Sequence, residues 1–369
     1  MSARAHGVWW RWGAVGALVA VLAALPAIVG ALPASDAAVP AADLRDAAVG
    51  SADVGFSGYA VSAGGLRLPV TQQLTEAADL FSDRTTMRVW WRGADDHRVD
   101  VLGAAGETGV HRDAGGTWTW DYESSVAARG EPASLALPSP PDLLPSSLGR
   151  RLLSEATGGE LTRIGARRVA GRDALGLRLV PAEPGSSVDR VDVWVDRATG
   201  LPLQVEVVAA GARQPALDTR FLDLDLGVPP ASVVAFTPPA DARIVPAPDP
   251  LSAALDSGRS SPAVQLPAAL AGLPRRPLEG VPPAVGVYGR GVTQLAVVPV
   301  SPGNTSGLRR ALHAAPGSVV GPAGVRLAAG PLAVMLVETP DLRAFLLAGT
   351  VTLDAVAEAG NGIWRLRPS

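Results

Sequence analysis

The stretch that decides the fold is residues 188–208, Val188-Asp-Arg-Val-Asp-Val-Trp-Val-Asp-Arg-Ala-Thr-Gly-Leu-Pro-Leu-Gln-Val-Glu-Val-Val208. Two runs alternate between aliphatic and polar residues, apart from Trp194, and the short connection 197–200 joins them. This pattern predicts an antiparallel β-hairpin. The polar face carries Asp192, Asp196 and Glu206, which we expect to be solvated rather than catalytic. The aliphatic face comprises Val191, Val193, Val195, Leu201, Leu203, Val205 and Val207.

Other strand-like segments flank the hairpin. Alternation predicts strands at 54–62, 66–74, 87–92, 98–102, 108–112, 116–122, 167–170, 174–181 and 219–226. Leucines at helical spacing predict one helix at about 143–157. A sheet with an apolar face must cover it. Two interpretations stay open: the face packs on this helix, or an apolar hollow remains that binds an alkyl chain. Burial of such a chain would gain roughly 0.8 kcal/mol of free energy per CH₂ group.

Composition excludes several classes of protein. The chain has 369 residues, 47% of them hydrophobic, and a formal net charge of -3, which gives no reason to expect nucleic-acid binding. It contains no Cys, which excludes a disulfide framework, a cysteine nucleophile, an iron–sulfur cluster and a thiolate zinc site. All basic side chains are Arg or His, because Lys is absent too. No cofactor is predicted.

The N-terminus predicts export. Arg4 and Arg11 precede an uncharged run at 13–32, which is close to the roughly 20 residues that a bilayer-spanning helix needs. We expect the rest of the chain on the extracytoplasmic face of the cytoplasmic membrane. Residues 1–35 are either a retained anchor, favoured by run length and the tryptophans at 9–12, or a cleaved signal peptide, favoured by Pro26 and Pro33. In the second case the protein is secreted.

Composition divides the remainder into parts. Residues 36–246 form the strand-rich domain, although 33–50 are Ala- and Pro-rich and are interpreted as a spacer. Residues 247–283, rich in Pro, Ala and Ser, are interpreted as a linker with room for one short helix around 262–273. A second domain is predicted at 284–369. In it we expect a helix capped by Thr305 or Ser306, and another capped by Thr352 and ending at Gly360.

Five short motifs, in this order, resemble one family of exported proteins. They are Phe56-Ser-Gly-Tyr59, Gly116-Thr-Trp-Thr-Trp-Asp-Tyr122, Trp194-Val-Asp196 with Thr199-Gly-Leu-Pro-Leu203, Phe236-Thr-Pro-Pro239 and Phe345-Leu-Leu-Ala-Gly-Thr-Val351. Together they are similar to the LolA/LolB and RseB/MucB family of lipid- and lipoprotein-binding proteins. The two-domain layout is more similar to RseB than to the single-domain carriers, and 345–351 resemble the actinobacterial RseB-like version. The chain departs from the lipoprotein members because it lacks their N-terminal Cys.

The resemblance implies an α+β fold, with an unclosed antiparallel β half-barrel plugged by helices and followed by a smaller α+β domain. It implies that the concave face binds acyl chains or lipoprotein tails, in a pocket lined by the aliphatic row listed above together with Trp118 and Trp120. It also implies an RseB-like regulator whose partner is a membrane anti-sigma factor. A lipid or lipoprotein carrier without a signalling partner is the alternative.

No catalytic or metal site is predicted. The histidines are His6, His97, His111 and His313, and no pair has the spacing of metal ligands. A Gly-x-Ser-x-Gly elbow and a His-Glu-x-x-His helix are both missing from the sequence. Trp118 and Trp120 fit either a ligand entrance or half-buried packing on a sheet. An envelope enzyme whose site the sequence does not reveal is a third interpretation.

Overall fold

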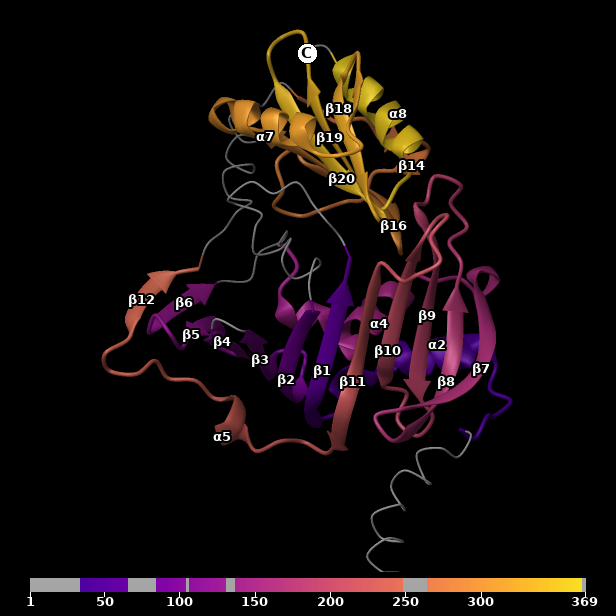
Figure 1. Cartoon of the computed structure of the whole chain (residues 1–369), viewed down its shortest axis with the longest axis vertical. Coiled ribbons are helices and arrows are strands. Elements are labelled where there is room, and N and C mark those ends of the chain that lie inside the picture. Colours follow the sequence, from indigo (N-terminus) through magenta and orange to yellow (C-terminus); the bar gives the residue numbers. More distant parts are fainter. Residues whose placement is uncertain (1–33, 66–83, 104–105, 131–136, 248–263, 367–369) are drawn as a thin grey trace, which may run out of the picture.

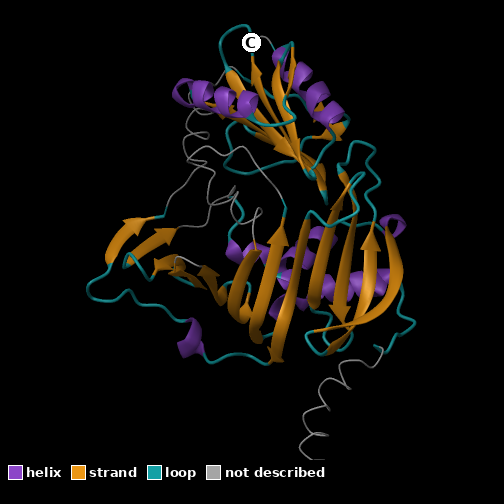
Figure 2. Cartoon of the chain, in the orientation of Figure 1, coloured by secondary structure: helices purple, strands orange, loops and turns teal. Residues whose placement is uncertain are grey.

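The computed structural model describes residues 34–65, 84–103, 106–130, 137–247 and 264–366. They form a twelve-stranded and a six-stranded β-sheet, each with helices against it, and a two-stranded hairpin; the six-stranded sheet lies over one end of the larger (Figures 1 and 2). We call residues 34–247 the first unit and 264–366 the second unit. The predicted export segment 1–35 lies almost wholly outside the described residues, and so does the predicted strand 66–74. Across the described ranges no helix has the length and apolarity needed to cross a membrane.

The large sheet has twelve strands in the order β12-β6-β5-β4-β3-β2-β1-β11-β10-β9-β8-β7. All neighbours are antiparallel except β12 and β6, and the end strands β12 and β7 do not meet, so the sheet stays open. This confirms the predicted unclosed antiparallel half-barrel. The strands are β1 (Phe56–Gly64), β2 (Arg84–Gly93), β3 (Asp96–Gly103), β4 (Gly106–Asp113), β5 (Gly116–Asp121), β6 (Val126–Gly130), β7 (Leu161–Val169), β8 (Arg172–Leu179), β9 (Val188–Asp196), β10 (Pro202–Ala209), β11 (Leu217–Leu226) and β12 (Arg243–Pro246).

The predicted hairpin is β9 and β10. Val193 pairs with Val205 and Val191 with Val207, so these four valines share one face. Asp196 orders the turn, because its Oδ2 accepts hydrogen bonds from the amide and hydroxyl of Thr199 at 2.9 and 2.7 Å. Gly200 follows at φ +76°, a conformation that glycine adopts without steric cost.

Two short helices cover this face: α2 (Ala41–Val49) and α4 (Pro145–Leu153). In Figure 1 both lie behind β8, β9 and β10. Leu44 and Ala48 of α2 and Leu153 of α4 join the valines in one apolar cluster. Gly149 lets α4 approach the sheet closely, since a Cβ there would lie 2.6 Å from Cβ of Pro202. Short single-turn helices η1 (Gly50–Asp53), η3 (Pro140–Leu143), η4 (Gly158–Glu160) and α5 (Ala231–Val234) complete the first unit.

Two predictions about the first unit were wrong. The spacer at 33–50 contains α2, whose weak amphipathic pattern is hidden by its alanines but whose Leu44 is 3% exposed. The polar face of the hairpin is not solvated: Asp192 is 4% exposed and Asp196 is 2% exposed, because arginines of neighbouring strands cover them. In addition, β6 and β12 carry no clear alternation and were not predicted.

The second unit contains a six-stranded sheet in the order β15-β16-β20-β19-β18-β17 and a two-stranded hairpin. Its helices are α7 (Pro302–Ala314) and α8 (Leu353–Trp364). The strands are β13 (Ala269–Leu270), β14 (Leu273–Pro274), β15 (Gly286–Arg290), β16 (Thr293–Val300), β17 (Val319–Gly321), β18 (Gly324–Ala329), β19 (Leu332–Glu338) and β20 (Ala344–Gly349).

The helix ends of the second unit differ from the predictions at two places. Helix α7 begins at Pro302 after Ser301, ahead of Thr305 and Ser306, because proline suits the first helical position. Thr352 caps α8 as predicted, accepting a hydrogen bond from the amide of Ala355 at 3.2 Å. Gly360 does not end α8. It permits close packing on β19, since a Cβ there would lie 2.5 Å from Sδ of Met335.

Part of the predicted linker 247–283 belongs to the apolar core of the second unit. Val264, Leu266, Leu270 and Leu273 are buried in the same cluster as Tyr288. Residues 269–274 form the β13–β14 hairpin, so the helix predicted around 262–273 is not found in its described part, 264–273. We therefore propose that the second domain begins near residue 264 rather than at 284.

Candidate functional site

The predicted acyl-chain face is an enclosed layer between sheet and helices. Val191, Val193, Val195, Leu201, Leu203 and Val205 are each 0% exposed, whereas Val207 is half-buried. The valines pack with α2 and α4, and the two leucines pack with Phe56, Leu143 and Leu144. Without movement of a helix, this face has no free surface for a ligand. The lining role of these residues stays a prediction.

Trp118 and Trp120 do not share this face. Directly paired residues of a sheet point the same way, and the tryptophans flank Thr119 on β5. Thr119 pairs with Val110, which pairs with Val99, which in turn pairs with Val89 of the apolar core. Thr119 therefore lies on the core face of the sheet. The structure therefore separates the two tryptophans from the aliphatic row and places them on the outer face of the sheet.

On the outer face both tryptophans pack on Phe236, which belongs to the segment between β11 and β12. The ring centroid of Phe236 lies 6.0 Å from that of Trp118, 5.9 Å from that of Trp120 and 4.5 Å from that of His111. The carbonyl of Val234 accepts a hydrogen bond from Nδ1 of His111 at 3.2 Å. Burial lowers the pKa of His111, which favours this neutral form. These contacts fit a packing role for the tryptophans.

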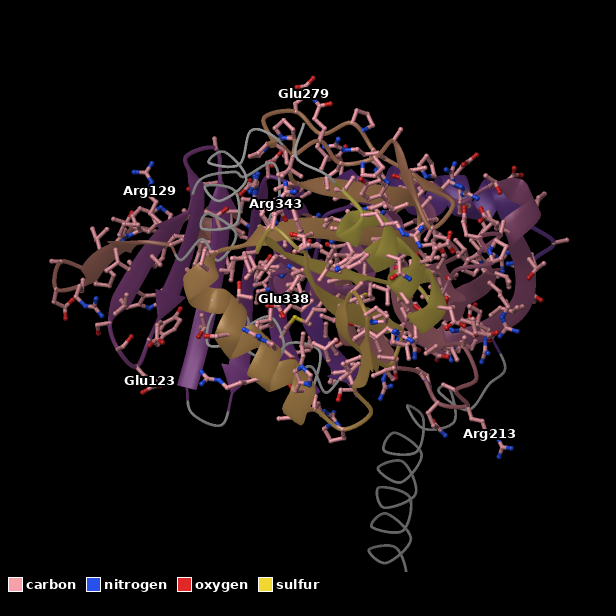
Figure 3. All side chains as sticks on the ribbon, turned by 90° about the horizontal axis from the view of Figure 1, so that it is seen from above. Glu123, Arg129, Arg213, Glu279, Glu338 and Arg343 are labelled. Carbon is pink, nitrogen blue, oxygen red and sulfur yellow. The ribbon has the colours of Figure 1, made fainter. Side chains whose placement is uncertain are left out.

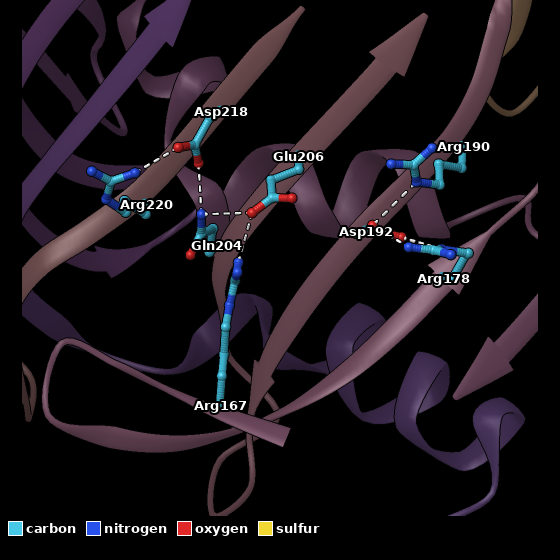
Figure 4. Close-up of polar contacts among 8 residues, drawn as sticks. All are labelled: Arg167, Arg178, Arg190, Asp192, Gln204, Glu206, Asp218 and Arg220. Atoms are coloured by element: carbon cyan, nitrogen blue, oxygen red, sulfur yellow. Dashed lines mark hydrogen bonds and ion pairs between the residues drawn. The ribbon is translucent and has the colours of Figure 1, made fainter. Parts of the chain in front are cut away.

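The outer face of β7–β11 carries a ladder of ion pairs (Figure 4). Arg178 grips both oxygens of Asp192 at 2.6 and 2.7 Å, and Arg190 lies 3.4 Å from the same carboxylate. A second chain runs through Arg220, Asp218, Gln204, Glu206 and Arg167. The guanidinium of Arg167 also lies 3.8 Å from the ring centroid of Trp194. Charges of both signs satisfy one another here, which indicates a structural role.

Another carboxylate is buried on β3. Asp100 is 0% exposed, and Arg98 donates to its two oxygens at 2.8 and 2.6 Å. Burial, together with the negative charge of Asp100, raises the pKa of Glu107. Within the described residues, no three His, Asp or Glu side chains gather so that they could hold a metal ion.

A surface cavity of about 530 Å³ lies on the second unit, between the β13–β14 hairpin and α8. It shares no residue with the predicted acyl-chain pocket. Its walls are Ala269, Leu270, Ala271, Asp354, Ala357, Glu358, Asn361, Gly362 and Arg365.

Ion pairs join the two units at the end of α4. Arg276 grips Glu155 with contacts of 2.9 and 2.7 Å, and Arg290 grips Glu160 with contacts of 3.1 and 3.0 Å. Arg290 also lies 2.9 Å from Glu183. The hydrogen bond from Arg276 lowers the pKa of Glu155, so the carboxylate stays charged.

A backbone contact adds to this junction. The amide of Ser187 donates to the carbonyl of Thr350 at 3.2 Å, and the amide of Thr352 donates to the carbonyl of Gly185 at 2.9 Å. Seen from above, strands β4 to β6 and their connections, which we call the β4–β6 wing and which carry Glu123 and Arg129, project to one side of the second unit (Figure 3). The second unit is thus anchored beside α4 rather than on the β4–β6 wing.

Solved structures similar to this chain include MucB and a LolA superfamily protein. A crystal structure of MucB in complex with MucA(peri) is 19% identical, with a TM-score of 0.49, and the match covers 89% of this chain and 99% of that one. The complex of Pseudomonas aeruginosa MucA/MucB is 20% identical, with a TM-score of 0.49 and coverage of 86% and 97%. A LolA superfamily protein from Nitrosomonas europaea is 13% identical, with a TM-score of 0.25 and coverage of 54% and 99%. No family model and no curated protein matches the chain.

These structures carry the names of the two groups that the sequence motifs resemble. At such identities the likeness concerns the fold alone. The actinobacterial qualifier stays a prediction.

Proposed function

We propose that this chain is a non-enzymatic extracytoplasmic protein that binds an acyl chain of a lipid or lipoprotein along the aliphatic face of the large sheet. The observation that carries the proposal is how this face is covered. Of the nine predicted lining residues, the seven aliphatic ones lie on this face, and six of these seven are 0% exposed. On the β7–β10 side the helices that cover them are only nine residues long, α2 and α4.

Such a cover can be exchanged for a ligand. Isolated helices shorter than about 12–15 residues are marginal in water, so α2 and α4 depend on their packing to stay folded. An alkyl chain offers the same kind of apolar contact. About 14 carbons at roughly 0.8 kcal/mol per CH₂ would gain on the order of 10 kcal/mol before ordering costs.

The regulatory role is proposed from the second unit and the motifs. The motifs and two-domain layout resemble RseB/MucB, and the chain carries a second sheet that a single-domain carrier lacks. MucB is recorded with MucA(peri). We propose a membrane anti-sigma factor as the partner class for this chain. The alternative is a carrier that delivers its lipid without a signalling partner.

Native mass spectrometry tests acyl-chain binding. We expect residues 34–369, mixed with a synthetic diacylated lipopeptide, to retain one lipopeptide per chain. Val207→Asp places a charge at the half-buried end of the aliphatic row and should weaken retention about tenfold, since an unpaired charge is costly in apolar surroundings. Glu206→Gln, one residue away on the other face, is the matched control and should bind like the parent. Failure of the parent chain to retain any lipopeptide would contradict the proposal.

Titration calorimetry and lipid transfer separate regulator from carrier. A regulator should bind the purified extracytoplasmic domain of an anti-sigma factor from its own organism, and should lose this binding when residues 264–369 are deleted. A carrier should move the lipopeptide between vesicles with or without these residues.

A further inference from the structure

The turn between β15 and β16 places a side chain of the second unit in the core of the first. Val292 is 8% exposed and belongs to the apolar cluster that contains Val193, Leu44 of α2 and Leu153 of α4. Gly291 precedes it at φ +54°, as the first central residue of a two-residue hairpin turn requires. A tight turn therefore aims Val292 into the layer that covers the aliphatic face.

Polar contacts of this turn converge on Glu155, just beyond α4. The amide of Gly291 donates to Oε2 of Glu155 at 2.6 Å, and Arg290 donates to the backbone carbonyl of Glu155 at 3.2 Å. Arg276 adds its bidentate pair to the same carboxylate. Glu155 lies two residues beyond the end of α4, so each contact restrains the C-terminal end of this helix.

The same helix end is fastened to the other covering helix. Arg45 of α2 donates to the carbonyls of Leu153 and Ser154 at 3.1 and 2.7 Å. The second unit therefore contacts the end of α4, and the end of α4 in turn contacts α2. Moving α4 away from Val193 requires that Glu155 leave Arg276 and that Val292 leave the cluster.

We propose that the 290–293 turn is a stopper that holds α4 on the aliphatic face, so that docking of the second unit and binding of an acyl chain oppose each other. Because linkage is reciprocal, an acyl chain that displaces α4 loosens the second unit by the same free energy that docking costs the ligand. This inference has two halves. The mechanical half, that the turn restrains α4, is independent of the proposed function. The acyl-chain half, that a bound acyl chain opposes this restraint, rests on the proposed function.

Hydrogen–deuterium exchange tests the mechanical half. We use the full chain in glyco-diosgenin, a sterol detergent without an alkyl tail, and follow amides 145–153. Arg276→Glu should speed their exchange about tenfold, the order expected from loss of charge-assisted hydrogen bonds. The double variant Glu155→Arg with Arg276→Glu restores opposite charges at this pair but not the acceptor for the Gly291 amide, so it should return exchange part of the way toward the parent rate. Arg343→Ala, which breaks a pair with Asp341 within the second unit, is the control and should leave α4 unchanged.

Dansyl undecanoic acid, added to the same samples, tests the acyl-chain half by its fluorescence. Arg276→Glu should bind it about tenfold more tightly than the parent, and the charge-swapped double variant should not. Exchange of 145–153 that stays at the parent rate in Arg276→Glu overturns the stopper. Faster exchange without probe binding in any variant keeps the stopper and removes the acyl-chain function. Probe binding that is equal in all variants overturns the opposition between docking and ligand.

Discussion

Arg290 and Glu160 join the two units through a two-pronged ion pair, with Nη1–Oε2 and Nη2–Oε1 distances of 3.1 and 3.0 Å. Glu160 is at the same time the last residue of a capping box, since its Oε2 accepts hydrogen bonds from the amide and hydroxyl of Thr157 at 2.8 Å each. One carboxylate therefore closes a turn of the first unit and holds an arginine of the second. Loss of its charge should affect both.

Acid should lower the unfolding free energy of the protein by protonating Glu160. Burial opposes ionisation, but hydrogen bonds from Arg290, Thr157 and Ala182 outweigh it and lower the pKa of Glu160 from 4.5 to about 2. Because the folded-state pKa lies below the unfolded value, its contribution is complete above pH 4.5 and is lost as pH falls toward 2. We expect a loss on the order of 3 kcal/mol of unfolding free energy over this range, measured by urea denaturation.

The variant Glu160→Gln should lack this part of the pH dependence and should already be weakened at pH 7. Glu279→Gln changes an exposed carboxylate of the second unit and should behave as the parent at each pH (Figure 3). An equal acid sensitivity of Glu160→Gln and the parent would show that the charge of Glu160 does not stabilise the junction.

Helix α4 should not tolerate a larger residue at its sheet-facing position. Alanine is preferred to glycine in a helix by about 1 kcal/mol, so Gly149→Ala would be stabilising on propensity alone. Its Cβ would, however, lie 2.6 Å from Cβ of Pro202 on β10, and overpacking costs about 1–3 kcal/mol. We expect net destabilisation, seen as a lower melting temperature. Gly307→Ala in α7 is the matched control: a Cβ there meets nothing within 4 Å, so this variant should gain stability.

The sequence predicted the hairpin well because its period-2 pattern follows directly from strand geometry. Val191, Val193, Val205 and Val207 do share one face, and Thr352 does cap α8. Alanine-rich α2 was missed because Ala fits a spacer and a helix equally well. Trp118 and Trp120 were assigned to the aliphatic face because alternation within a strand gives the relative side of its residues, whereas the absolute side depends on register across several strands.

The junction could not be predicted from sequence. Glu155 and Arg276 are separated by 121 positions, and their pairing depends on how the two sheets dock. Asp192 and Asp196 have the ordinary pattern of a solvated strand face. They are buried because arginines pair with them, Arg172 and Arg178 from β8 and Arg190 from β9.

Removal of the Asp192 carboxylate should be strongly destabilising. Arg178 and Arg190 both form ion pairs with this side chain, which is 6% exposed. Asp192→Ala therefore removes one ion-pair partner from each guanidinium. Because the two guanidiniums that remain are 36% and 29% exposed, we expect a loss of about 1.5–3 kcal/mol, the range for hydrogen bonds to a charged group. Chemical denaturation measures the loss. Asp189→Ala removes a 52% exposed carboxylate that also contacts Arg190 and should cost less than about 1 kcal/mol. Similar losses for the two variants would mean that burial of Asp192 does not strengthen its ion pairs.

Phe236 should fasten the segment between β11 and β12 to the outer face. Its ring contacts three aromatic side chains, and Phe236→Ala removes these contacts together with its apolar area. Because Phe236 is itself only partly buried, we expect a loss of about 2 kcal/mol, below the range for a fully buried phenylalanine. Tryptophan emission should shift to longer wavelength, since Trp118 and Trp120 gain contact with water. Val228→Ala, at a 63% exposed position of the same segment, should change neither stability nor emission. An unshifted emission spectrum in Phe236→Ala would show that the segment stays in place without its aromatic contact.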